Sequence, residues 1–110
     1  MISEQMVEKA LEQMRTSAEA LGKAKAERIY LEQFRKSKKA LLFSDAPDGT
    51  IADRESYAYK HPEYVELLDS LKTAVEQEEA LKWKMVAAEA YVEVWRTQQA
   101  NARAQDNSHR

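Results

Sequence analysis

The sequence predicts an all-α fold, an antiparallel hairpin of two long helices joined by a short connecting helix. Three observations lead to this prediction. The 110 residues include only two glycines and two prolines, which leaves little material for turns. Ala, Glu, Lys, Leu, Gln and Arg, the strong helix formers, dominate the composition. Finally, apolar residues recur at steps of three and four over long proline-free stretches, as in coiled-coil-like helices.

The first helix is predicted from about residue 4 to about residue 43, because Ser3 can cap its start and no proline follows until Pro47. Its apolar stripe is expected to contain Val7, Leu11, Met14, Ala18, Leu21, Ala24, Leu31, Phe34 and Leu41, with Glu27 and Lys38 completing the spacing. Two successive steps of three near Gly22 predict a stammer, a local overwinding of the helix.

A turn is predicted at residues 44–49, where Asp side chains can bond the nearby backbone and Gly49 is free to take a positive φ. Thr50 and Asp53 have the spacing of a capping box, so a short helix is expected over residues 51–59. Pro62 should stop this helix and occupy the first position of the next.

The third helix is predicted from Pro62 to about residue 104, followed by a disordered tail at residues 105–110; residues 1–104 form a single domain. Its heptad positions are Tyr64, Leu67, Leu71, Ala74, Leu81, Met85, Ala88, Val92, Trp95 and Ala102, interrupted only by Glu78 and Gln99. After residue 80 a second apolar row joins them, formed by Ala80, Ala87, Tyr91 and Val94.

The resulting apolar arc is too wide for one partner helix to cover, so we expect self-association into a four-helix arrangement. The predicted oligomer interface consists of Met85, Ala88, Tyr91, Val92 and Trp95. Trp83 lies off this heptad row and is therefore a candidate for an exposed contact residue.

Several functional classes are excluded or disfavoured by composition. The chain contains no cysteine, which excludes disulfides, zinc–thiolate sites and thiol nucleophiles. The longest uncharged apolar stretch is too short to span a bilayer, and the first residues lack the features of a signal peptide. We therefore expect a cytoplasmic protein without membrane contact.

Catalysis is not expected, since the sequence shows neither a serine, histidine and acid set nor a glycine-rich phosphate loop. No cofactor or metal is implied. Glu27 and Glu78 interrupt the two apolar rows and would face each other in the hairpin. Pairing with Arg28 or Lys82, or exposure where the apolar phase slips, is the main interpretation. The alternative, a carboxylate metal site in a metal-dependent hydrolase, would require turnover to depend on Glu27, Glu78 or Glu79.

Basic residues gather in two places, although the net charge of −2 argues against a protein that coats nucleic acid by bulk electrostatics. If the chain binds nucleic acid, the expected phosphate contacts are Arg28, Arg35, Lys36, Lys39, Arg96 and Arg103. The favoured interpretation of the first four is pairing with the acidic start of the third helix, which carries Glu63, Glu66, Asp69, Glu76, Glu78 and Glu79.

Four segments carry a family resemblance, namely residues 28–40 (RIYLEQFRKSKKA), 54–58 (RESYA), 62–64 (PEY) and 93–98 (EVWRTQ). In these segments the chain resembles small uncharacterised helical proteins of phages and prophages that are encoded near recombination or replication genes. The resemblance covers residues from about 24 to about 103. It implies a role in phage DNA metabolism, in the cytoplasm of the host cell.

Two functional hypotheses follow. The first is a non-enzymatic phage accessory protein that assists DNA recombination or replication by binding single-stranded DNA or a recombination or replication protein. The second is a protein-interaction module without nucleic-acid binding, such as an inhibitor of a host protein or an assembly factor, in which the wide apolar arc docks a partner helix.

Overall fold

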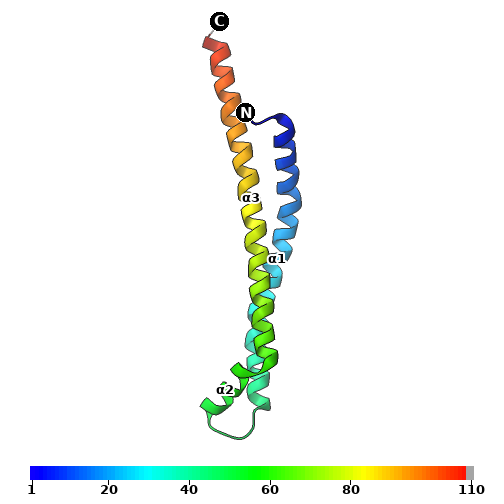
Figure 1. Cartoon of the computed structure of the whole chain (residues 1–110), viewed down its shortest axis with the longest axis vertical. Coiled ribbons are helices and arrows are strands. Elements are labelled where there is room, and N and C mark those ends of the chain that lie inside the picture. Colours follow the sequence, from blue (N-terminus) through cyan, green and yellow to red (C-terminus); the bar gives the residue numbers. More distant parts are fainter. Residues whose placement is uncertain (109–110) are drawn as a thin grey trace. The chain divides into compact units, whose positions relative to one another are not determined.

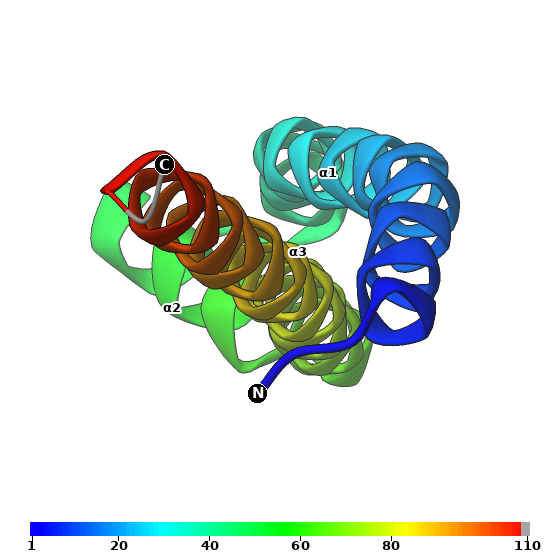
Figure 2. The same ribbon diagram turned by 90° about the horizontal axis from the view of Figure 1, so that it is seen from above.

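In a computed structural model that describes residues 1–108, the protein is all-helical, with no strand among these residues. Its helices are α1 (Glu4–Asp45), α2 (Ile51–Lys60) and α3 (Pro62–Ser108) (Figure 1). Figure 2 shows α2 as a short helix distinct from the longer α1 and α3. Within the described residues, no helix has a stretch long and apolar enough to cross a membrane.

The observed helix ends lie slightly beyond the predicted ones. The largest difference is at the end of α3, which continues to Ser108, so the prediction that a disordered tail starts at residue 105 is wrong for residues 105–108. Because none of these four residues is proline or glycine, nothing in their backbone chemistry ends the helix at residue 104. His109 and Arg110, the rest of the predicted tail, lie outside the described residues.

Local hydrogen bonds explain where each helix begins, and they confirm the predicted caps. At the start of α1 the Ser3 hydroxyl accepts from the Met6 N–H at 3.2 Å. Thr50 and Asp53 form the capping box of α2, each side chain accepting from the other residue's N–H. Before α3, the His61 ring nitrogen Nδ1 accepts from the Glu63 N–H at 3.1 Å.

Gly49 takes part in the turn for a different reason than predicted. It has no positive φ, so backbone freedom is not what this position uses. A Cβ placed on Gly49 would instead meet the Cβ and Oδ2 of Asp53 at 3.2 Å. A residue with a Cβ at this position would require the capping side chain of Asp53 to shift by a few tenths of an ångström.

The chain divides into two compact units, which are described separately. The terminal unit consists of Met1–Leu21 together with the chain from Glu79 onward, and the central unit is Gly22–Glu78. In the terminal unit the buried residues Val7 and Ala10 of α1 pack with Ala88 and Val92 of α3. These two segments run antiparallel, and the Ile2 N–H donates to Gln98 Oε1 at 3.2 Å.

The central unit contains two small cores. Leu31 of α1 packs with Leu67 and Ala74 of α3 in one of them. In the other, Ala58 of α2 is fully buried with Leu42 and Tyr64. Ion pairs flank these cores, because Arg28 pairs with Glu78 and Lys38 pairs with Glu63. The α1 and α3 segments of this unit are therefore also antiparallel.

The buried row of α1 differs from the predicted stripe. Buried or half-buried positions follow alternating steps of three and four: Val7, Ala10, Met14, Ser17, Leu21, Ala24, Arg28, Leu31, Arg35, Lys38 and Leu42. Because this spacing is unbroken, the predicted stammer near Gly22 is wrong. Leu11 and Leu41 are 51% and 58% exposed, and Phe34 is 38% exposed. Ala18 and Glu27 are exposed as well.

The predicted row of α3 is confirmed by burial from Tyr64 to Gln99, whereas Ala102 is exposed.

One polar residue in the α1 row is explained by a local contact, since the buried Ser17 hydroxyl accepts from Gln13 Nε2 at 2.7 Å. A satisfied hydroxyl is tolerated in a core position where an unpaired one would be costly.

Candidate protein-interaction surface

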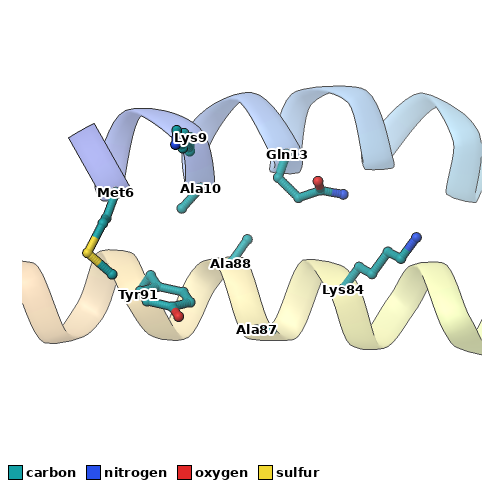
Figure 3. Close-up of a pocket in the computed structure, with 8 residues that line it drawn as sticks. All are labelled: Met6, Lys9, Ala10, Gln13, Lys84, Ala87, Ala88 and Tyr91. Atoms are coloured by element: carbon teal, nitrogen blue, oxygen red, sulfur yellow. The ribbon is translucent and has the colours of Figure 1, made fainter. Parts of the chain in front are cut away.

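An open groove of about 440 Å³ lies between α1 and α3 in the terminal unit (Figure 3). The wall from α1 is formed by Met6, Lys9, Ala10 and Gln13. The wall from α3 is formed by Lys84, Ala87, Ala88 and Tyr91. We call this site the terminal groove.

Small residues produce the floor of the terminal groove. Ala10 and Ala88 are 7% and 5% exposed and belong to the contact between the two helices, and Ala87 beside them adds no bulk. Two larger apolar residues, Met6 and Tyr91, lie toward one end of the groove (Figure 3) and are 41% and 45% exposed. The groove therefore has an apolar floor with apolar side chains still open to solvent.

The charge of the terminal groove is entirely positive. Lys9 and Lys84 line its two walls, and no acidic residue lines it. Neither ammonium group forms an ion pair within residues 1–108. Lys84 has only Ala and Leu at helical distances of three and four residues. Near Lys9, Glu12 is engaged by Arg15, whose guanidinium lowers the pKa of the Glu12 carboxyl.

The five residues of the predicted oligomer interface have different environments in the terminal unit. Ala88 and Val92 are buried within the unit, and Met85 and Trp95 are half-buried. Of the five, only Tyr91 is largely exposed to solvent. The exposed large apolar residues of α3 in this unit instead include Trp83 at 64%, Val86 at 43% and Val94 at 46%.

Several basic residues of the central unit are engaged by its own side chains. Arg28 is 24% exposed, donates to both carboxylate oxygens of Glu78 and donates to Glu32 Oε1 at 2.9 Å. These hydrogen bonds raise the pKa of the Arg28 guanidinium. Pairing between helices, the favoured interpretation of this cluster, is thus observed for Arg28. Arg35 is half-buried in the α1 row.

Lys39 contacts an aromatic ring in the same unit. Its ammonium lies 4.6 Å from the centroid of the Tyr59 ring, and the Tyr59 side chain raises the pKa of Lys39. Lys36 is exposed. Nearby on α1, the rings of Tyr30 and Phe34 stack at 5.9 Å and are 61% and 38% exposed.

The two predicted phosphate contacts of α3 lie on the surface of the terminal unit. Arg96 donates to Glu93 Oε1 at 2.9 Å, with its side chain 67% exposed. Arg103 is exposed in the last turns of α3.

The carboxylates considered for a metal site are not arranged as a facing pair. Glu78 is held by Arg28, whereas the exposed Glu27 lines a smaller groove with Ser70 and Thr73. Among residues 1–108, no group of three His, Cys, Asp or Glu side chains is placed to hold a metal ion.

The sequence indicated only one wall of the terminal groove, through the second apolar row with Ala87 and Tyr91. The opposite wall, with Met6 and Lys9, depends on which face of α1 packs against α3, and there the predicted stripe contained the exposed Leu11 in place of the buried Ala10. Comparison of this chain with known protein families, curated proteins and solved structures gives no match.

Proposed function

We propose that this protein is a non-enzymatic protein-interaction module that docks further helices against the exposed apolar residues of its terminal unit. One observation carries the proposal. The buried core of this unit consists of two valines and two alanines, against which Ile2, Met14 and Trp95 pack. Met6, Trp83, Tyr91 and Val94 stay substantially exposed elsewhere on the unit. Large exposed apolar residues of this kind are typical of interaction surfaces.

The free energy available from covering these residues is considerable. An aromatic side chain has roughly 150–250 Å² of surface to bury, which at about 25 cal/mol per Å² corresponds to roughly 2 kcal/mol for the exposed part of Tyr91. Trp83, with 64% exposed, offers somewhat more. A few such residues can offset the entropy cost of docking one helix.

Self-association is one form that this function can take. In the proposed arrangement the chain is an antiparallel hairpin in the cytoplasm, and a second copy supplies the covering helices to complete four. The antiparallel packing inside each unit supports the hairpin, and Tyr91, Val94 and Trp83 replace the buried Ala88 and Val92 as the expected contacts.

Site-specific photocrosslinking in the cells that make the protein tests this function. A photoreactive amino acid at Val94 should give discrete crosslinked products, which mass spectrometry identifies as a second copy or another protein. The same amino acid at Ile51, which is 72% exposed on α2, is the matched control. Identical products from both positions, or no product from position 94, would contradict the proposal.

Binding of single-stranded DNA is a second candidate, supported by the exposed stack of Tyr30 and Phe34 on the helix that carries Arg35 and Lys36. Such aromatic rings can stack with bases while nearby cations contact phosphates. In this candidate function the protein is a phage accessory factor for recombination or replication.

Fluorescence anisotropy of a labelled single-stranded oligonucleotide, at low and physiological salt, tests DNA binding. The double substitution Lys36→Gln/Arg103→Gln should weaken binding and reduce its salt dependence by removing phosphate contacts. Lys60→Gln is the control. A wild-type protein that does not bind at low salt would end this hypothesis.

A further inference from the structure

We propose that the terminal groove is a docking site for an amphipathic helix that carries carboxylates beside its apolar stripe. This inference rests on the proposed function as a protein-interaction module and specifies the partner. Shape and charge support it separately.

The shape of the terminal groove fits a short length of helix. Its walls extend from Met6 to Gln13 on α1 and from Lys84 to Tyr91 on α3, about two helical turns or about 10 Å on each. A helix lying along it can direct side chains at positions i, i+3 or i+4, and i+7 onto the alanine floor. Leu, Ile or Met side chains of the partner would fill the space that the alanines leave.

The charge of the groove determines the chemistry of the partner. Lys9 and Lys84 lie on opposite walls and have no carboxylate partner within residues 1–108. Carboxylates on a docked helix could pair with both ammonium groups at the rim, where charge complementarity selects partners more than it adds affinity. Two copies packed groove against groove would instead bring lysines together, and a basic helix would be repelled. Charge therefore favours an acidic helix over a second copy packed groove against groove.

A pair of synthetic helical peptides of about 18 residues, long enough to form helix, provides the probe. Both carry leucine at i, i+3 and i+7; one has glutamate at the flanking positions and the other has lysine there. Titration into the full-length protein, followed by peptide fluorescence anisotropy, should show the glutamate peptide binding about tenfold more tightly, because two rim ion pairs are replaced by two repulsions.

Two variants test the roles of charge and shape. In the charge-reversed protein Lys9→Glu/Lys84→Glu, the preference should change to the lysine peptide. Its matched control is Lys36→Glu/Lys60→Glu, which changes the net charge equally through exposed lysines of the central unit and should keep the original preference. In Ala87→Phe, a ring fills the groove at an exposed position, and both peptides should bind at least about tenfold more weakly. Circular dichroism confirms that each variant remains helical.

Each result has a defined meaning. Equal binding of the two peptides, both lost in Ala87→Phe, would overturn the preference for an acidic partner and leave the interaction function intact. Absence of binding by either peptide would overturn the docking site, and crosslinking at Val94 would still report on the interaction function. A wild-type homodimer that Ala87→Phe converts to monomer in sedimentation equilibrium would overturn the proposal in favour of a second copy.

Discussion

The adjacent leucines Leu41 and Leu42 provide a test of which face of α1 is buried. Leu42 is 3% exposed and packs with Ala58 and Tyr64, whereas Leu41 is 58% exposed. Leu42→Ala removes buried methyl groups and leaves a cavity, at a cost of about 3 kcal/mol in the free energy of unfolding. Leu41→Ala should cost less than about 1 kcal/mol, because less than half of its surface is buried and alanine favours helix.

Urea denaturation followed by far-UV circular dichroism measures both variants. With an m value of about 1.3 kcal/mol/M, a difference of about 2 kcal/mol places the two midpoints about 1.5 M urea apart, Leu42→Ala being lower. Both substitutions remove the same atoms at neighbouring positions of one helix, so propensity and chain entropy cancel between them. Equal midpoints, or a lower midpoint for Leu41→Ala, would refute the buried row that the structure assigns to α1.

Three further predictions concern single residues. Gly22→Ala should raise the free energy of unfolding by about 0.5–1 kcal/mol, because Gly22 lies inside α1 and a Cβ there meets nothing within 4 Å; an unchanged or lower urea midpoint would count against this. Gly49→Ala should lower the stability, since its Cβ displaces the capping side chain of Asp53. An unchanged urea midpoint would show that this side chain can shift and still cap the helix. Lys38 lowers the pKa of Glu63 below its ordinary value, so this ion pair stabilises the protein at neutral pH, and the stabilisation is lost as the pH falls through the lowered pKa. In Glu63→Gln this part of the acid destabilisation should be absent. Identical dependences of unfolding free energy on pH for wild type and variant would contradict the prediction.

The start of each helix could be predicted from the sequence because caps depend on residues a few positions apart. Ser3, the pair Thr50 and Asp53, and Pro62 all act where predicted. The buried row of α3 could also be predicted from the sequence, since most of its positions from Tyr64 to Trp95 hold apolar residues. Capping residues are therefore sufficient to predict where the helices start, and the spacing of apolar residues is sufficient to predict the buried row of α3.

The buried row of α1 could not be found from apolar spacing alone. Ser17, Arg28 and Arg35 occupy row positions that the predicted stripe left out, and apolar residues such as Leu41 lie outside the row. Arg28 is accommodated by Glu78, a residue 50 positions away, and such a pairing is visible only once the helices are packed. The terminal groove was missed for the same reason, because it depends on the face that α1 presents to α3.

Alanine-methyl NMR of the full-length protein, titrated with the glutamate-flanked peptide, tests the docking of an acidic helix most directly. Ala10, Ala87 and Ala88 line the terminal groove, while Ala58 and Ala74 lie in the cores of the central unit and serve as internal controls. If an acidic helix docks there, the three groove methyl signals should shift saturably and the two controls should change little. Shifts spread equally over all five methyl groups, or no shift in the groove, would contradict it.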